Sequence, residues 1–275
     1  MSSRETEDLD LTRKQRREQA RSERKAMEEA AATSASRRTR LTQLGVVVAV
    51  VVVAIVVILI ATGGKGSKPV KAGTHQATQV AAGVDKLVGG IPQSGNTLGK
   101  ATAPVTLQYY GDLECPFCKA FTLGALPSII EKWVRTGKLR VEYHALETAT
   151  REPETFRTQQ VAALAAGKQA KMWNYIELFY HEQGEEDSGY VTESYLQGLA
   201  GQVKGLDLAK WTSDRTDTKL DAQVANDAQA ANGVGFTGTP SFLVGKTGGA
   251  SEKLEVTSFT DAGPFNAAIE KLLKS

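Results

Sequence analysis

Residues 105–121 read VTLQYYGDLECPFCKAF, and this stretch carries the strongest structural signal in the chain. Its first six residues are mostly β-branched or aromatic, which predicts a strand that ends at the following Gly-Asp turn. The two cysteines of the chain, Cys115 and Cys118, come directly after that turn. Apolar residues then recur at helical spacing up to Gly137. We therefore expect a strand, a short loop and a helix whose first turn holds the second cysteine.

The rest of the globular part is predicted in the same way. Further strands are expected at residues 139–146, 241–244 and 254–256, helices across the Ala-, Gln- and Leu-rich region 154–230, and a last helix at 264–273. Pro127 predicts a kink in the helix after the cysteines, because proline has no amide proton to donate. This order of elements is that of an α/β fold with a long helical insertion.

The cysteine pair points to redox chemistry. A secreted disulfide scaffold needs more cysteines at wider spacings, and a zinc site needs four ligands. Thiol–disulfide exchange needs a thiolate, and the free N–H groups and partial positive charge of a helix N-terminus lower the pKa of a thiol. Cys115 is expected where those N–H groups point, and Pro116 suits the first helical turn. We predict that Cys115 faces solvent and attacks, and that Cys118, one turn inside and less accessible, resolves.

A proline supplies a second signal. Residues 238–244 read GTPSFLV, which places Pro240 immediately before a short apolar strand. Because proline cannot donate to a sheet, its position at the entrance of a strand marks an edge or a tight turn. A proline at such a position is compatible with a cis Thr239–Pro240 bond.

The histidines and tryptophans are predicted to be structural or surface residues. The histidines are scattered over the sequence, which gives a Cys-His protease pair or a zinc cluster little support. They are His75, His144 and His181. The tryptophans are expected in the core rather than on a binding platform. They are Trp133, Trp173 and Trp211.

An apolar run precedes the globular part. Residues 44–61 read LGVVVAVVVVAIVVILIA, 18 residues with no charged or polar side chain. As a helix this run is about 27 Å long, enough to cross a bilayer. We expect an uncleaved anchor rather than a signal peptide, because a long tail precedes it and no clear small-x-small cleavage pattern follows it. Basic residues flank both ends of the run, so their charge does not decide its orientation. We expect the N-terminus inside the cell, because a disulfide-forming domain needs an oxidising compartment.

These observations divide the chain. We predict a polar cytoplasmic tail at 1–43, the transmembrane anchor at 44–61, a linker at 62–88, and one domain at 89–275 that includes the helical insertion. Residues 1–44 hold 11 Lys/Arg and 8 Asp/Glu, which leaves 22 and 23 for residues 63–275. A near-neutral domain without a basic cluster has a poor prospect of binding nucleic acid.

Taken together, the CPFC motif and the Thr-Pro loop resemble the thioredoxin superfamily, and the long helical insertion resembles its DsbA-type thiol-disulfide oxidoreductases. The segments GIPQSGNTLG, APVTL and DLECPFC are similar to those of the membrane-anchored bacterial branch, common in actinobacteria. The resemblance implies a thioredoxin-like fold, with Cys115 as the attacking thiol and Cys118 as the buried resolving thiol. It also implies that Thr239 and Pro240 form the cis-proline loop, with the backbone of Thr239 offered to an extended substrate chain.

Two positions differ from the pattern of that superfamily. Many members carry a buried acid six residues before the first cysteine, where this chain has Tyr109. Proton transfer to and from the second thiol must therefore use another group or water, and Asp112, Glu114 and Glu142 are the candidate groups. Strongly oxidising members often have histidine before the second cysteine, where this chain has Phe117, so the missing cation leaves the oxidising power open.

The leading functional prediction is an enzyme that introduces disulfides into exported proteins and is reoxidised by a quinone-linked membrane protein, as the resemblance implies. No cofactor is expected besides the Cys115–Cys118 disulfide. A disulfide reductase or isomerase is the nearest alternative, because the direction of exchange follows reduction potential. A membrane-tethered module that binds peptides without catalysis is a second alternative. Delivery of copper or heme has little support, because no additional His or Met lies near the cysteines.

Overall fold

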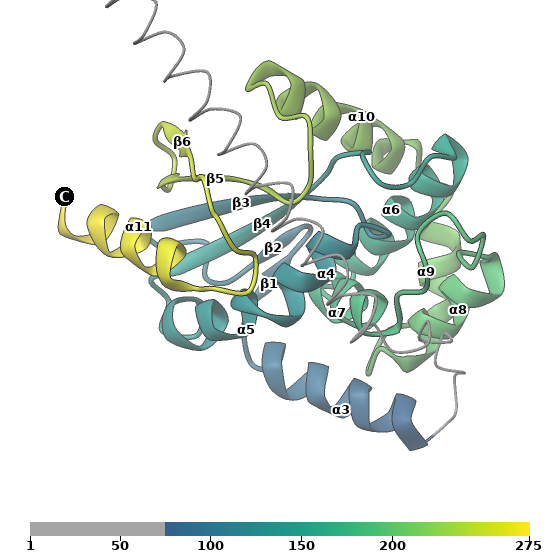
Figure 1. Ribbon diagram of the computed structural model, residues 1–275. Helices are drawn as coiled ribbons and strands as arrows, with labels where there is room; N and C mark the ends of the chain where they lie inside the picture. Colours follow the sequence, from purple (N-terminus) through teal and green to yellow (C-terminus); the bar gives the residue numbers. More distant parts are fainter. Residues whose placement is uncertain (1–74) are drawn as a thin grey trace, which may run out of the picture. The chain divides into compact units, whose positions relative to one another are not determined.

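The computed structural model describes residues 75–275, which belong to one compact unit. Its centre is a six-stranded sheet of order β1-β2-β4-β3-β5-β6 (Figure 1). Strands β3 and β4 are parallel and the other neighbours are antiparallel. The strands are β1 Gln93–Ser94, β2 Thr97–Leu98, β3 Val105–Gly111, β4 Leu139–Ala145, β5 Ser241–Lys246 and β6 Ser251–Lys253.

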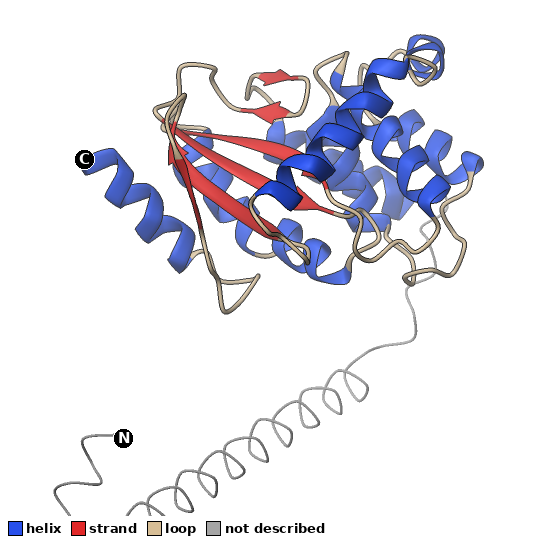
Figure 2. Cartoon of the chain, turned by 90° about the horizontal axis from the view of Figure 1, so that it is seen from above, coloured by secondary structure: helices blue, strands red, loops and turns tan. Residues whose placement is uncertain are grey.

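Helices flank this sheet. Figure 1 shows α11 at one end of the domain and most of the block from α6 to α10 at the other. Figure 2 shows α11, which ends at the marked C-terminus, on one side of the strands. The block is the helical insertion expected at 154–230, and it separates β4 from β5. The helices are α3 His75–Val88, α4 Pro116–Leu123, α5 Ala125–Ile129, the π-helical turn η1 Ile130–Val134, α6 Pro153–Gly167, α7 Met172–Glu182, α8 Glu193–Gln202, α9 Leu208–Asp214, α10 Thr218–Gly233 and α11 Gly263–Lys274.

An aromatic cluster fastens α4 to the sheet. Phe121 of α4 packs on Tyr109 of β3 with ring centroids 4.9 Å apart, and on Phe242 of β5 at 4.7 Å. Phe265 of α11 completes the cluster 4.9 Å from Phe242. All four side chains are buried, and each contributes roughly 1.5–3 kcal/mol through burial. The helix that carries the cysteines is thereby held rigidly against the central strand.

The helix after the cysteines breaks before Pro127. α4 ends at Leu123, and Gly124 separates it from α5. In a continuous helix the carbonyl of Leu123 would accept the N–H of residue 127, but Pro127 has no N–H to donate. A Cβ at Gly124 would lie 2.5 Å from the carbonyl oxygen of Ala120, so only glycine fits this close approach. The predicted kink is confirmed, and it takes the form of a break three residues earlier.

The predicted start of the domain near Gly89 is wrong. Residues 75–88, placed in the linker, form α3, and Val84 and Val88 from one face of it are buried in the main core. The buried face of α3 has few large apolar residues, and alanines fill its other positions. Its apolar periodicity is therefore too weak to distinguish residues 75–88 from a spacer. The rest of the predicted linker, the tail and the anchor at 44–61 lie outside the described residues. Within residues 75–275 no helix is long and apolar enough to cross a membrane.

The last strand also differs from the prediction. β6 consists of the polar residues 251–253, whereas the apolar residues Leu254 and Val256, expected to form it, lie after the strand. Both are partly buried against the main core. An edge strand is held by backbone hydrogen bonds and needs no apolar side chains, which explains the error. The hairpin of β1 and β2 was not predicted, since each strand has two residues.

An ion pair joins the insertion to the sheet on β4. His144 Nδ1 lies 2.8 Å from Asp227 Oδ1 of α10, and Asp227 Oδ2 accepts the backbone N–H of Ala145 at 3.0 Å. Burial alone would lower the pKa of His144, but the hydrogen bond with Asp227 and the nearby negative charge of Glu142 outweigh it and raise this pKa to about 9. His144 is therefore structural, as predicted.

We expect Asp227→Asn to lower the free energy of unfolding by about 1–3 kcal/mol, because it weakens a hydrogen bond to a charged group. Since the folded-state pKa of His144 lies above its unfolded value, this stabilisation is complete below pH 6.5 and is lost as pH rises through about 9. Urea unfolding at pH 6.5 and pH 10 should show a difference between wild type and variant that narrows at the higher pH. Asp221→Asn, on the same helix but half exposed, should change stability by less than about 1 kcal/mol. A difference that stays constant with pH would contradict the assignment.

Candidate active site

The CPFC motif lies where the sequence places it, at the N-terminus of α4. Cys115 is the N-cap residue, with extended backbone angles φ −69° and ψ 121°, and Pro116 occupies the first turn. The N–H of Cys115 donates to the carbonyl of Asp112 at 3.1 Å, which closes the turn after β3. Both cysteines are free thiols in this structure.

The proline loop lies against the motif. The Thr239–Pro240 bond is cis, as predicted, and the Cys115 thiol donates to the Thr239 carbonyl at 3.4 Å. The hydroxyl of Thr239 hydrogen-bonds with that of Thr148, which follows β4. Residues more than 120 positions apart in the sequence thus meet at one sulfur atom.

The surroundings of Cys115 favour its thiolate. The hydrogen bond with the Cys118 thiol contributes most. Together with the side chain of Thr239 and the backbone N–H groups of Cys118 and Phe117, it lowers the pKa of Cys115 to about 6, against the opposing effect of burial. The N–H groups are those of the first turn of α4, which have no partner within the helix. At neutral pH Cys115 is therefore mostly ionised.

Cys118 has the opposite character. Its residue is fully buried, and burial, followed by the hydrogen bond with and the negative charge of Cys115, raises its pKa well above the usual value. The backbone N–H of Asp112 and the hydroxyl of Tyr109 hydrogen-bond to it and partly offset this rise. The predicted difference between an activated and a buried thiol is present.

The exposure of Cys115 differs from the prediction. The residue is only 4% exposed, whereas its neighbour Phe117 is 59% exposed. The Thr239–Pro240 loop lies against the sulfur and limits access to it. The phenyl ring of Phe117 packs near that of Phe259, with ring centroids 5.8 Å apart, so an aromatic pair lies at the CPFC motif.

The carboxylate of Asp112 organises the loops around the motif. It accepts the backbone N–H groups of Thr148, Ala149 and Thr150 at 2.8–3.0 Å, and that of Glu114 at 3.1 Å. The hydroxyl of Thr150 adds a bond of 2.7 Å. A carboxylate with so many donors already bound serves as a structural link between two loops, not as a free acid for Cys118.

The other two predicted proton carriers have separate surroundings. Burial raises the pKa of Glu114 to about 7, so it titrates near neutral pH beside Cys115. Glu142 lies on β4 and pairs with Arg140 at 2.8 Å and with His144 at 3.8 Å. The partners of Glu142 therefore lie on β4, and neither cysteine is among them.

Two residues of α7 and its end support the motif and were not predicted. Gln183 donates to the carbonyls of Leu113 and Cys115 at 2.7 and 3.1 Å. The hydroxyl of Tyr180 donates to the carbonyl of Asp112 at 3.1 Å. Nothing in their local sequence signals a link to residues some 70 positions away.

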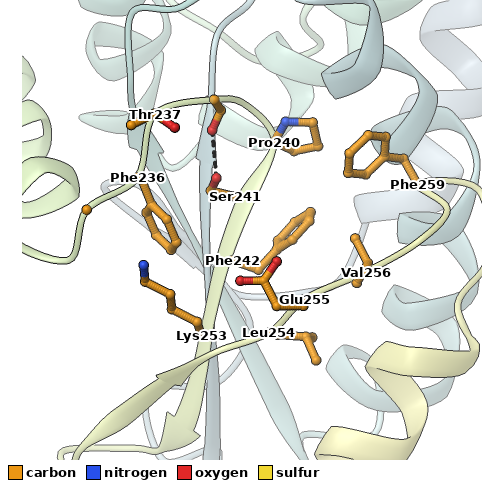
Figure 3. A pocket seen from close by; sticks show the side chains of 12 residues that line it. Phe236, Thr237, Pro240, Ser241, Phe242, Lys253, Leu254, Glu255, Val256 and Phe259 are labelled. Atoms are coloured by element: carbon orange, nitrogen blue, oxygen red, sulfur yellow. Dashed lines mark hydrogen bonds between the residues drawn. The ribbon is translucent and has the colours of Figure 1, made fainter. Parts of the chain in front are cut away.

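A hollow of about 240 Å³ lies beside Pro240. Figure 3 shows that Pro240 and Phe259 lie at one end and that Lys253 lies near Phe236 at the other, with the Lys253 ammonium 5.2 Å from the ring centroid of Phe236. Its lining residues are Gly235, Phe236, Thr237, Gly238, Pro240, Ser241, Phe242, Lys253, Leu254, Glu255, Val256 and Phe259. Within residues 75–275 no group of three or more His, Cys, Asp or Glu residues is arranged to hold a metal ion.

Comparison with known proteins identifies the family of this domain. A family model described as thioredoxin matches residues 93–257. The chain belongs to the thioredoxin family. The cysteine pair, the cis-proline loop and the central β3–β4–β5 sheet all fall within the matched residues.

Individual relatives share parts of the chain. Disulfide bond formation protein D of Bacillus subtilis is 25% identical over 187 residues, which cover 64% of this chain and 76% of that protein. A Na⁺/H⁺ antiporter NhaA 1 of Salinispora arenicola is 28% identical over 183 residues, 66% of this chain. The chain spans only 26% of the length of that antiporter.

Solved structures support the fold of this thioredoxin-family domain. The crystal structure of oxidised BdbD from Bacillus subtilis aligns with a TM-score of 0.57 and 23% identity, covering 69% of this chain and 99% of BdbD. That of Wolbachia pipientis α-DsbA1 aligns with a TM-score of 0.54 and 22% identity, covering 65% of this chain and 90% of that one.

The alkylation rate of the reduced full-length protein should follow a single midpoint near pH 6, because only the Cys115 thiolate reacts readily. Below this pH the thiolate is protonated and the rate should fall. Cys118→Ala should move the midpoint upward, towards that of an ordinary cysteine, since it removes the strongest hydrogen-bond donor to the thiolate. Iodoacetamide kinetics with mass spectrometry of the labelled cysteine provide the measurement. A wild-type midpoint of pH 8 or above would contradict this description of the site.

Proposed function

We propose that this protein is a thiol-disulfide oxidoreductase that introduces disulfides into exported proteins. The observation that carries the proposal is the opposite character of two sulfurs one helical turn apart. Cys115 is held as a thiolate with a pKa of about 6, whereas burial keeps Cys118 as a thiol. A zinc pair or a structural pair would not require this difference.

The reaction starts from the Cys115–Cys118 disulfide. A substrate thiolate attacks the sulfur of Cys115, the disulfide bond breaks, and Cys118 leaves with the electron pair and takes a proton from solvent. A second substrate thiolate then attacks the mixed disulfide and Cys115 leaves as a thiolate. The substrate is oxidised by two electrons and the enzyme is reduced by two. Because a stabilised Cys115 thiolate favours the reduced enzyme, the oxidised enzyme is a good disulfide donor.

The aromatic pair and the hollow beside Pro240 support binding of an extended polypeptide. Next to Cys115 the chain presents the exposed ring of Phe117, the ring of Phe259 and the backbone of Thr239. An extended substrate segment would use that backbone for strand-like hydrogen bonds and the hollow for a side chain. The substrate class that fits is an unfolded or partly folded protein with two free cysteines.

The two single cysteine variants test the activity. In cells that express the full chain, Cys118→Ala should accumulate mixed disulfides with exported proteins, seen as high-mass bands on non-reducing gels that disappear on reduction. Cys115→Ala should trap almost none, because the buried Cys118 thiol has no access to substrate. Equal trapping by both variants would overturn the roles, and trapping by neither would favour the peptide-binding module. A redox equilibrium with glutathione that strongly favours the enzyme disulfide would favour a reductase.

Location and reoxidation belong to the same proposal. We place the domain outside the cytoplasm, held by a single anchor at residues 44–61, with the N-terminus inside. Support comes from the 18-residue apolar run and from the oxidising compartment that disulfide formation requires. The electrons gained by the enzyme would pass to a quinone-linked membrane protein, so that the Cys115–Cys118 disulfide is restored.

Fractionation tests the anchor. The full chain should stay in the membrane fraction after an alkaline wash, because an 18-residue apolar helix does not leave the bilayer. Deletion of residues 1–62 should release a folded, redox-active domain into the soluble fraction. Replacement of residues 44–61 by a polar Gly-Ser stretch of equal length controls for the loss of the tail. Membrane retention of either variant would show a second attachment.

A further inference from the structure

The opening of the disulfide places a negative charge at a buried position. When a thiolate attacks Cys115, the electron pair moves to Cys118, whose residue is 0% exposed. A thiolate in such a place is destabilised unless donors reach it. The formation of this thiolate rests on the exchange reaction proposed above.

The acids near the motif are occupied elsewhere. The carboxylate of Asp112 accepts the N–H groups of residues 148–150, and this residue offers Cys118 only its backbone N–H. Glu142 pairs with Arg140 and His144 on the sheet. Glu114 has Thr150 and Asp187 as its hydrogen-bond partners. None of these carboxyl groups is a hydrogen-bond partner of Cys118.

Tyr109 is the side chain that does face Cys118. Its hydroxyl is close enough to the Cys118 sulfur to lower the pKa of that thiol, and it lies 3.4 Å from the hydroxyl of Thr122, one turn further along α4. Its ring is locked by the edge-on contact with Phe121 at 4.9 Å. Strand β3 thus points a fixed, fully buried hydroxyl at the face of α4 that carries Cys118.

The hydrogen-bond directions around Tyr109 follow from its neighbours. A carbonyl only accepts, so Tyr180 must donate its proton to the Asp112 carbonyl. The oxygen of Tyr180 is then free to accept, and Tyr109 donates to it at 3.1 Å. A tyrosine carries a single hydroxyl proton, so Tyr109 donates either to Tyr180 or to Cys118.

We propose that Tyr109 is the hydrogen-bond donor that stabilises the Cys118 thiolate as the disulfide opens, by turning its proton from the oxygen of Tyr180 to the sulfur. No proton is transferred in this step: the electron pair of the broken bond stays on Cys118, which later takes a proton from solvent. Burial raises the pKa of Tyr109 well above its usual value, so the hydroxyl keeps its proton while donating.

Tyr109→Phe tests this role with minimal change in packing. The full chain, purified in mild detergent and fully oxidised, is mixed with excess glutathione, and disulfide opening is followed by acid quench, alkylation and mass spectrometry. We expect opening to slow about ten- to a hundredfold, as for the loss of a hydrogen bond to a charged group. The equilibrium constant with glutathione should change by no more than about twofold, because Cys118 is an uncharged thiol in the reduced enzyme.

Tyr143→Phe is the matched control. Tyr143 faces Tyr109 in register on β4, its ring lies 5.3 Å away, and its buried hydroxyl has Gln160 and Tyr180, not Cys118, as its neighbours. The disulfide of Tyr143→Phe should open at close to the wild-type rate. A wild-type rate for Tyr109→Phe, or equal slowing in both variants, would overturn the proposal.

Tyr180→Phe gives an independent outcome. It removes the competing acceptor, so the proton of Tyr109 is more available to Cys118, and opening should be as fast as wild type or faster. Slowing comparable to that of Tyr109→Phe would show a packing role and overturn the proposal, even if Tyr109→Phe failed to fold. Failure of the proposed function looks different, because wild type itself would then show no disulfide exchange.

Discussion

The buried carboxylate of Asp112 is the link on which the active site depends. It lies at the turn between β3 and α4, and its oxygens accept three consecutive N–H groups from the loop that follows β4. A buried carboxylate is costly unless its lone pairs are filled, and backbone donors fill them here. The link fixes the turn that presents Cys115. It also holds Thr148 where its hydroxyl meets Thr239, so that the proline loop is joined to the same network.

The thiols of Cys115 and Cys118 have opposite pKa shifts because they lie one helical turn apart, in different surroundings. Cys115 is the N-cap residue of α4 and lies beside the free N–H groups of the first turn, which carry the positive end of the helix dipole and lower its pKa. Cys118 has already entered the helix and faces the sheet, where Tyr109 and the backbone of Asp112 are its donors. The hydrogen bond between the two sulfurs increases the contrast, because the thiol of Cys118 stabilises the thiolate of Cys115. In this chain these local donors lower the pKa of Cys115 without a histidine at position 117.

The sequence predicts those parts of the site that local patterns encode. The strand before the motif and Cys115 at the helix start follow from spacing and from the chemistry of single residues. The cis bond at Pro240 needed in addition the resemblance to the thioredoxin superfamily. The contacts of Tyr180 and Gln183 with the motif join residues about 70 positions apart and have no local signature.

The prediction for Asp112 shows a second limit. Its carboxylate was expected among the possible proton carriers because of its position near the cysteines, but which donors fill a carboxylate depends on how a distant loop folds. The linker prediction failed for a similar reason. Val84 and Val88 of α3 gain their significance from the core that they contact, which the sequence of that segment does not show.

The environment of Cys118 favours neutral groups over charges. Cys118 itself is an uncharged thiol in the reduced protein, because burial raises its pKa well above the usual value. The buried tyrosines 109, 143 and 180 are neutral as well, because burial raises their pKa values well above the usual one. A second anion beside Cys118 would repel the thiolate that forms there, since unit charges interact strongly where water is excluded. Hydroxyl groups avoid this repulsion and still offer a dipole to the sulfur. A buried tyrosine at position 109 therefore suits a leaving thiolate better than a carboxylate would, whereas it is a poorer base for removing a proton from the resolving thiol.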